Sequence, residues 1–301
     1  MPSSHSEPSK VQDQNFDKLA QKFANNIYGT PKGQIRAAIL WRDLQEQLPY
    51  FAGRKLRVLD AGGGFGFFSQ KLAAMGHEVV LCDISSAMLE QAREQIAASA
   101  EPLDIQLLHC AIQELNVTEL GQFDLILCHA VAEWLHDAKG TLAGLLSLLK
   151  DDGLFSLMFF NKEAMRFHAL VSGNLDYVAA DLQTRKKVRL SPKHPLQIAD
   201  VQAWFNEWQL ELRCESGVRV IHDYLKKSLP DNLDFQQLLE MELKYSRQQP
   251  YLSLGRYVHF IAHKASGRTT RSRVDLCHPL SDPDNGSLPA PAAPGVRDPC
   301  V

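Results

Sequence analysis

The sequence predicts an α/β fold: a doubly wound, mostly parallel seven-stranded sheet with helical cap insertions. Three observations lead to this prediction. Short apolar runs alternate with helix-length runs along most of the chain, which is the order that a parallel sheet with crossover helices requires. A glycine-rich turn joins the first strand-like run to the helix-like run after it. The last two strand-like runs have the shape of a closing antiparallel pair.

The expected elements follow in chain order, beginning with a helix over Lys32–Leu48. Strands are expected at Arg57–Ala61, Glu78–Asp83, Ile105–Cys110, Phe123–Ala130, Gly153–Phe160, Leu210–Val220 and Arg256–Lys264. The first four are continuous apolar runs, as in a sheet that is covered on both faces. Intervening helices are expected at Phe67–Met75, Ser86–Ser99 and Lys139–Leu149, with Ser85 or Ser86 as an N-cap.

Two insertions interrupt a single domain expected over residues 13–264. Ligands of open α/β sheets bind beyond the carboxyl ends of the strands. Residues 161–200 leave from such an end and are expected to cap the substrate, whereas residues 222–253 could cap or brace. Residues 1–12 are expected to form a disordered leader. Residues 265–301 are expected to be a disordered tail, because they hold six of the 15 prolines and no aromatic residue.

Bulk composition excludes some classes of protein. A net charge of -3 argues against a protein that coats nucleic acid through bulk charge, although a local basic patch is still possible. No apolar run is long enough to cross a bilayer, and the start of the chain lacks the apolar stretch of a signal peptide. A cytoplasmic location without membrane contact is therefore expected. The six cysteines show no Cys-x-x-Cys spacing, so no metal site is predicted.

The run from Leu56 to Gly66 carries the strongest functional signal. Its spacing is Asp-x-Gly-x-Gly-x-Gly, which differs from the Gly-x-Gly-x-x-Gly of dinucleotide dehydrogenases because residue 67 is Phe. The spacing favours a nucleoside without a pyrophosphate and resembles the S-adenosylmethionine site of class I methyltransferases. We expect the backbone of Gly62 and Gly63 to lie against the methionine part of this cofactor; the alternative is a tight turn that binds no ligand.

The next strand ends supply further candidates. Asp83 is predicted to accept hydrogen bonds from both ribose hydroxyls, and helix capping is its alternative role. Ile112 could flank the adenine, whose edge a backbone amide or the Gln113 side chain could bond. His129 could touch the methionine carboxylate or border the methyl group, or it could be a structural histidine.

Several stretches outside the glycine turn identify a more specific resemblance. They are Asn26–Arg36, Leu56–Gly64, Gly76–Asp83, Ser156–Asn161, Gly173–Val178, Ser216–Leu225 and Tyr251–Tyr257. Through them the chain from Asp13 to about Lys264 resembles the tRNA 5-carboxymethoxyuridine methyltransferase family. One departure is Phe65, where the family carries Glu; the backbone turn survives, but a polar contact from that side chain is not expected.

The resemblance implies an activity and a set of contacts. The activity is transfer of a methyl group from S-adenosylmethionine to the oxyacetate carboxylate of the wobble uridine of tRNA, giving a methyl ester. The implied cofactor contacts are Arg36, Gly62, Gly63, Asp83, Ile112, Gln113 and His129. A guanidinium such as that of Arg36 can hold the cofactor's carboxylate with two hydrogen bonds. A carboxylate acceptor is already ionised at pH 7, so we expect no catalytic base, only positioning and exclusion of water.

Candidate tRNA contacts are cationic or aromatic. The basic run Arg185, Lys186, Lys187 and Arg189 could contact phosphates near the anticodon or be a solvated loop. Weaker cationic or polar candidates are Arg219, His222, Tyr224, Arg247 and Arg256. Tyr28, Phe159, Phe160 and Tyr177 could stack on a flipped base, although core packing is the safer interpretation for the two phenylalanines. The sequence leaves open which cation pairs with the oxyacetate.

Two alternatives to tRNA methylation stay open. One is an O-methyltransferase of a small-molecule acid or phenol, which would not need the basic run at 185–189. The other is a cofactor-binding partner subunit without activity of its own, against which the intact glycines and Asp83 argue.

Overall fold

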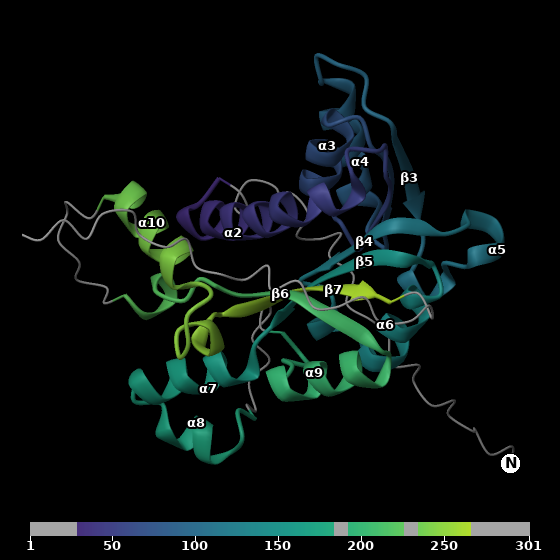
Figure 1. Cartoon of the computed structure of the whole chain (residues 1–301). Helices are drawn as coiled ribbons and strands as arrows, with labels where there is room; N and C mark the ends of the chain where they lie inside the picture. Colours follow the sequence, from purple (N-terminus) through teal and green to yellow (C-terminus); the bar gives the residue numbers. More distant parts are fainter. Residues whose placement is uncertain (1–28, 184–191, 226–233, 266–301) are drawn as a thin grey trace, which may run out of the picture. The chain divides into compact units, whose positions relative to one another are not determined.

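The computed structural model describes residues 29–183, 192–225 and 234–265. These residues contain a seven-stranded sheet with the order β3-β2-β1-β4-β5-β7-β6 (Figure 1). Its strands are β1 (Arg57–Ala61), β2 (Glu78–Asp83), β3 (Ile105–His109), β4 (Phe123–His129), β5 (Leu149–Phe160), β6 (Leu210–Val218) and β7 (Tyr257–Lys264). The first five are parallel, and β7 runs antiparallel to both β5 and β6. The predicted sheet and its antiparallel closing pair are confirmed.

Helices join the strands at the expected places. They are α2 (Pro31–Gln47), α3 (Phe67–Ala74), α4 (Ser86–Ala97), α5 (Val117–Leu120), α6 (Ala138–Leu146), α7 (Lys162–Val171), α8 (Leu175–Ala179), α9 (Ile198–Glu207) and α10 (Phe235–Tyr245). Short 3-10 turns are η2 (Leu48–Phe51), η3 (Ile112–Glu114), η4 (Ala132–Trp134), η5 (His222–Tyr224) and η6 (Leu252–Leu254). Of the two predicted caps for α4, the structure has Ser85, whose hydroxyl accepts the amide hydrogen of Met88 at 3.2 Å.

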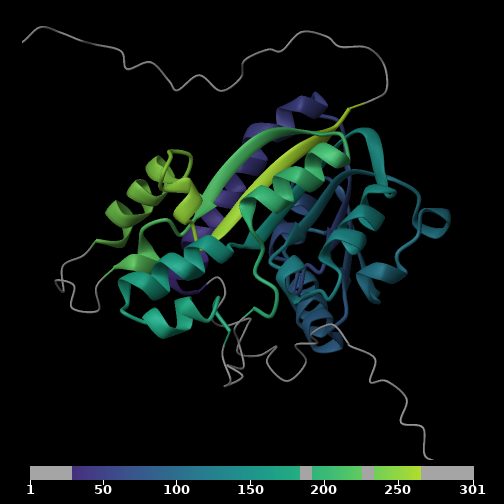
Figure 2. The same cartoon turned by 90° about the horizontal axis from the view of Figure 1, so that it is seen from below.

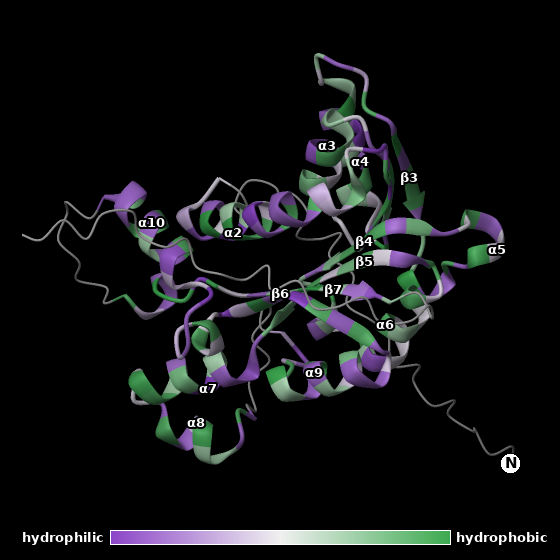
Figure 3. Ribbon diagram, in the orientation of Figure 1, coloured by the Kyte–Doolittle hydropathy of each residue, from purple (hydrophilic) through white to green (hydrophobic). Residues whose placement is uncertain are grey.

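Apolar cores cover both faces of the sheet. Val58 and Leu127 belong to the core beneath α2 and α3, whereas Leu59 and Ile126 belong to the core that α6 and α9 cover. Figures 1 and 2 show α2 and α9 on opposite faces. Figure 3 shows that the covering helices carry both hydrophilic and hydrophobic residues, as amphipathic helices do.

The third strand departs from the expected coverage. Side chains of β3 are at most half-buried, and Gln106 and His109 are exposed. The prediction of a strand covered on both faces is wrong here, because β3 is an edge strand that pairs with β2 alone. Its apolar residues pack partly against α4 through Leu107.

The two insertions contact different parts of the fold. Asn161, directly after β5, caps α7 and donates through Nδ2 to the carbonyls of Ser253 and Gly255 at 2.8 and 3.0 Å. In the second insertion, α10 packs beside α2 (Figure 1), and the Glu242 carboxylate accepts backbone N–H groups just after β6. The predicted leader lies outside the described residues, as does the predicted tail from residue 266 onward. Among the helices described, none has the length and apolar character needed to cross a membrane.

Candidate functional site

The glycine turn requires glycine for two different reasons. Gly62 and Gly64 have φ of +75° and +59°, in the left-handed region that L-residues rarely adopt. Gly63 has ordinary backbone angles, but a Cβ there would lie 2.4 Å from Cγ of Asp60. The amides of Gly62 and Gly63 donate to the carbonyl of Cys82 at 2.8 and 3.2 Å. The turn is therefore tied to the end of β2 and lies half-buried at the carboxyl edge of the sheet.

Asp83 links this turn to the start of α4. Its Oδ2 accepts the Gly64 amide at 2.9 Å, and its Oδ1 accepts the Ser85 amide at 2.8 Å. Because Ser85 is the cap of α4, Asp83 does not have that role. Each carboxylate oxygen can accept a second hydrogen bond, so the ribose contact remains chemically possible.

Asp60 is buried beneath the turn. It is 3% exposed, and the Ser69 hydroxyl donates to it at 2.6 Å. Burial, with a smaller contribution from the charge of Asp83, raises the pKa of Asp60 to about 6, although the Ser69 hydrogen bonds oppose this rise. Asp60 thus packs against the buried side of the glycine turn and links it to α3 through Ser69.

Ile112 lies beside the glycine turn, but the Gln113 side chain points elsewhere. A Cβ placed on Gly62 would lie 3.4 Å from Cδ1 of Ile112 and 2.6 Å from Cγ2 of Val131. The exposed Gln113 side chain donates to the Thr141 hydroxyl of α6 at 3.3 Å. Sequence reasoning missed Val131, whose only signal was its place two residues after β4.

His129 ends β4 and is partly exposed. Its Nε2 lies 2.9 Å from the Ser156 hydroxyl, and its ring packs edge-on against Phe68 at 5.4 Å. Burial of the ring holds the pKa of His129 well below its ordinary value, and the charges of His259 and Arg36 add to this effect. The imidazole is therefore neutral near pH 7.

Arginines gather at the same edge of the sheet. Tyr257 begins β7 opposite Phe160 and Val218, the last residues of β5 and β6. The guanidinium of Arg36 lies 4.8 Å from the centre of the Tyr257 ring, and that of Arg219 lies 5.2 Å from the same centre. Two cations thus share one aromatic ring at the carboxyl edge, where ligands of such sheets bind.

The Asp223 carboxylate pairs with three cations at this edge. Its carboxylate lies 3.0 Å from Nε of Arg219, 3.4 Å from Nε of Arg256 and 3.8 Å from Nζ of Lys32. Burial alone would raise the pKa of Asp223, but the nearby His222 ring, whose Nδ1 lies 3.7 Å from the carboxylate, and the three cations hold it well below its ordinary value. Burial lowers the pKa of Arg219, which is 8% exposed.

The edge also contains groups without hydrogen-bond partners among the described residues. Both carboxylate oxygens of Glu133, which is 0% exposed, lack one, as does Nε of Arg36. Nε of Arg219 faces Asp223 at 3.0 Å, but outside hydrogen-bond geometry. Burial raises the pKa of Glu133 to about 7, while nearby backbone amides and Arg36 limit the rise. Arg219 also has a left-handed φ of +62°. Buried polar groups without partners are uncommon, so this edge is a candidate ligand site.

We define the Arg36 cluster as Lys32, Arg36, Arg219, Arg256, Asp223 and Glu133. The four cations outnumber the two carboxylates. Only Arg219 of the four cations is buried, but a surplus of positive charge at a ligand edge favours anionic groups such as carboxylates or phosphates.

Other predicted contacts have different outcomes. Arg247 donates to Asp43 and Glu46, both at 2.6 Å, beside α2, and its contact with the substrate stays a prediction. Phe159 is 0% exposed and packs against Phe260, which confirms its role in the core.

The remaining candidates are partly placed. The Tyr224 hydroxyl donates to the Leu254 carbonyl at 2.7 Å, and Tyr177 is half-buried on α8. Tyr28, Arg185, Lys186, Lys187 and Arg189 lie outside the described residues.

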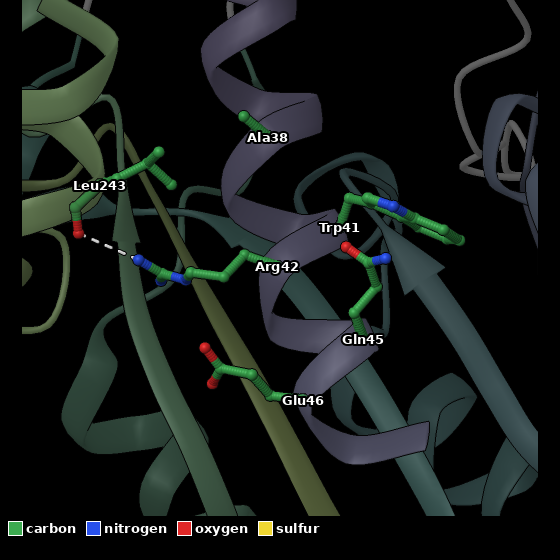
Figure 4. A pocket seen from close by; sticks show the side chains of 6 residues that line it. All are labelled: Ala38, Trp41, Arg42, Gln45, Glu46 and Leu243. Carbon is green, nitrogen blue, oxygen red and sulfur yellow. Dashed lines mark hydrogen bonds between the residues drawn. The ribbon is translucent and has the colours of Figure 1, made fainter. Parts of the chain in front are cut away.

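A hollow of about 540 Å³ lies away from the predicted site, between α2 and α10 (Figure 4). It is largely open and is lined by Ala38, Trp41, Arg42, Gln45, Glu46 and Leu243. Arg42 donates to the Leu243 carbonyl at 2.9 Å. None of the lining residues was predicted to bind the cofactor or tRNA, and the unpartnered charges lie at the sheet edge, so we place the candidate site at that edge.

Comparison with known proteins identifies the family. Residues 59–157 match a family model described as a methyltransferase domain. The chain is 44% identical over 258 residues to the tRNA 5-carboxymethoxyuridine methyltransferase of Escherichia coli strain K12, covering 86% of this chain and 99% of that protein. It is 27% identical over 182 residues to a ubiquinone biosynthesis O-methyltransferase of Xanthomonas campestris, covering 57% of this chain and 71% of the relative.

Solved structures share the fold. Magnesium protoporphyrin IX methyltransferase from Synechocystis PCC 6803, with bound SAH (S-adenosylhomocysteine), matches with a TM-score of 0.58 at 15% identity, covering 83% of this chain and 96% of that one. The sheet is therefore that of class I S-adenosylmethionine-dependent methyltransferases. Together with the near-complete match to the Escherichia coli relative, this shows that the chain belongs to the tRNA 5-carboxymethoxyuridine methyltransferase family.

Proposed function

We propose that this protein transfers a methyl group from S-adenosylmethionine to the carboxylate of 5-carboxymethoxyuridine at the wobble position of tRNA, giving the methyl ester. One observation carries the proposal: a nucleoside-type glycine turn and a surplus of arginine charge lie at the same edge of one sheet. The name of the Escherichia coli relative supports the same acceptor. We infer a cytoplasmic location from the tRNA substrate.

The residues at the glycine turn fit the cofactor. In the proposal Asp83 holds the ribose hydroxyls, Ile112 flanks the adenine, and the backbone of Gly62 and Gly63 lies along the methionine part. The carboxylate of that part pairs with Arg36, whose Nε has no partner among the described residues, next to His129. Gln113 reaches the adenine edge through its backbone amide, or through its side chain if that leaves Thr141. S-adenosylmethionine supplies an electrophilic methyl group when bound.

The acceptor carboxylate is held by Arg219 in this proposal. Arg219 shares the Tyr257 ring with Arg36, so the two proposed carboxylate sites are neighbours. The acceptor oxygen is ionised at neutral pH, so no side chain has to remove a proton. The work of the residues is to orient the two anions and to exclude water.

Contacts with the anticodon region come from the first insertion and the segment before α2. We propose that Arg185, Lys186, Lys187 and Arg189 contact phosphates and that Tyr28 and Tyr177 stack near the target base. The helices α7 and α8 of the insertion would form the cap over the acceptor.

The test uses purified protein, isotope-labelled S-adenosylmethionine and tRNA from cells that lack this enzyme. Mass analysis of the wobble nucleosides should show 5-carboxymethoxyuridine gaining the mass of one labelled methyl group in place of one hydrogen. Unchanged free acid, together with methylation of a small-molecule acid or phenol, would contradict the proposal. Cofactor binding without transfer to any tRNA would instead indicate a non-catalytic partner subunit.

A further inference from the structure

A chain of hydrogen bonds crosses the sheet from His129 to α2. The hydroxyl of Ser156, on β5, lies 2.9 Å from Nε2 of His129 and 2.8 Å from Nε2 of His259, on β7. Nδ1 of His259 lies 2.8 Å from Oδ2 of Asp43, on α2. We call these four residues the His129 chain. They connect the predicted cofactor edge to the sheet face that α2 covers.

The chain is buried except at the end that faces the site. Ser156, His259 and Asp43 are each 0% exposed, whereas His129 is partly exposed. Nδ1 of His129 makes no hydrogen bond within the described part of the protein. A line of polar groups through an apolar core is tolerated only when each member is bonded. Every internal member is bonded here, and the one unbonded nitrogen belongs to the residue predicted to touch the cofactor.

Proton positions along the chain depend on one another. Arg42 and Arg247 donate to Oδ1 of Asp43 at 2.7 and 2.6 Å, so this carboxylate is an ionised acceptor and Nδ1 of His259 must carry a proton. If His259 is neutral, Ser156 donates to it and accepts from His129, leaving a lone pair at Nδ1 of His129. If His259 is charged, the order reverses and Nδ1 of His129 carries the proton. Each charge state of His259 thus sets one tautomer of His129.

We propose that Ser156, His259 and Asp43 are positioning residues that hold the His129 ring and determine which of its nitrogens carries the proton at the cofactor site. This inference rests on the proposed function, in which His129 contacts the cofactor. Other charged or titratable groups also face the chain: Arg36, Arg42 and Glu46 from α2, Arg247 after α10, and Cys214 from β6.

The first experiment measures binding of S-adenosylhomocysteine by calorimetry. Ser156→Ala should weaken binding about three- to tenfold, as expected for loss of one hydrogen bond. In a His129→Ala background the same substitution should have no further effect, because there is no ring left to position. Ser147→Ala is the control: this hydroxyl donates to the Gly144 carbonyl of α6, outside the His129 chain and the groups that hold it, so affinity should be unchanged. Ser156→Cys replaces Ser156→Ala if thermal unfolding shows that the alanine variant does not fold.

Equal weakening in both backgrounds, or no weakening in a folded Ser156 variant, would overturn the inference. A second measurement does not depend on the cofactor. Nitrogen-15 NMR of the ligand-free protein should show His129 as a single tautomer, and Ser156→Ala should produce a mixture. A mixture already present in the wild type would also overturn the inference. If the wild type binds no S-adenosylhomocysteine, the proposed function fails, while the NMR result still decides whether the chain positions His129.

Discussion

Two clusters of buried polar side chains differ in whether the protein itself supplies their hydrogen-bond partners. We define the Asp43 network as Asp43 with Arg42, Arg247, Ser216 and the His129 chain, and in it Asp43 receives hydrogen bonds from three side chains. In the Arg36 cluster, the Glu133 carboxylate and Nε of Arg36 have no hydrogen-bond partners among the described residues. Both groups lie around α2 and contain carboxylates at or near full burial.

The two clusters therefore have different effects on stability. A buried carboxylate whose hydrogen bonds come from the protein stabilises the fold. A buried carboxylate without such hydrogen bonds destabilises the ligand-free fold and contributes to ligand binding instead. The pKa values follow this division. The pKa of Asp43 lies well below its ordinary value, because its hydrogen bond to His259 and the charges of His259, Arg42 and Arg247 outweigh burial. Burial raises the pKa of Glu133 to about 7.

The largest expected effect is on stability, from Asp43→Asn. Breaking a buried ion pair from one side leaves uncompensated charge, so the free energy of unfolding should fall by about 3–5 kcal/mol in urea titrations at pH 7. Because the folded pKa of Asp43 is depressed, its contribution is fully present above the unfolded value of 3.8 and is lost as pH falls through the folded value. Asp104→Asn, at an exposed ion pair with Lys55, is the control and should change stability little. A loss below about 1 kcal/mol would remove the contrast between the two groups.

The next effect is on activity, from Arg219→Gln. Loss of a charge-assisted hydrogen bond to the acceptor should lower kcat/KM for tRNA by about 100-fold. Binding of S-adenosylhomocysteine should stay within about twofold, because the proposal assigns the cofactor carboxylate to Arg36. Arg166→Gln, on α7 and paired with Glu163 and Asp181, serves as the control. Equal losses for both variants would argue against an acceptor site at Arg219.

For Glu133→Gln we expect a smaller change in the free energy of unfolding, opposite in sign to that of Asp43→Asn. The folded pKa of Glu133 is raised from 4.5 to about 7, so its ionisation destabilises the ligand-free fold increasingly as pH rises from 4.5 to about 7 and fully above that. The substitution should therefore raise the free energy of unfolding at pH 8 by about 1–2 kcal/mol and change it little at pH 4.5. Urea titrations at the two pH values check this. Destabilisation at pH 8 would mean that the protein itself satisfies Glu133.

The smallest effect is expected for Gln113→Ala. Its side chain is exposed and bonds Thr141, so cofactor affinity should fall by no more than about threefold. Calorimetry with S-adenosylhomocysteine measures this, with Thr141→Val as the partner variant. A tenfold loss would show that the side chain turns toward the adenine on binding.

Much of the fold could be predicted because local patterns carry it. Continuous apolar runs identified β1, β2 and β4, and the glycine spacing located the turn, since φ near +75° at Gly62 is a local requirement. Full coverage of β3 was predicted wrongly, because the position of a strand within a sheet depends on partners far away in sequence. The ion pair of Arg247 was not predicted for the same reason: its partner Asp43 is about 200 residues earlier.

By itself, the sequence determined the parallel sheet, the cofactor turn and the family resemblance, since these depend on periodicity and short motifs. Only the tertiary structure decided which charged side chains have hydrogen-bond or ion-pair partners within the protein. It joined His129 to Asp43 through two other strands, and it left Glu133 and Nε of Arg36 without hydrogen-bond partners among the described residues at the sheet edge. The physical reason is that burial and hydrogen-bond completion arise from contacts between residues distant in the chain, which no local pattern records.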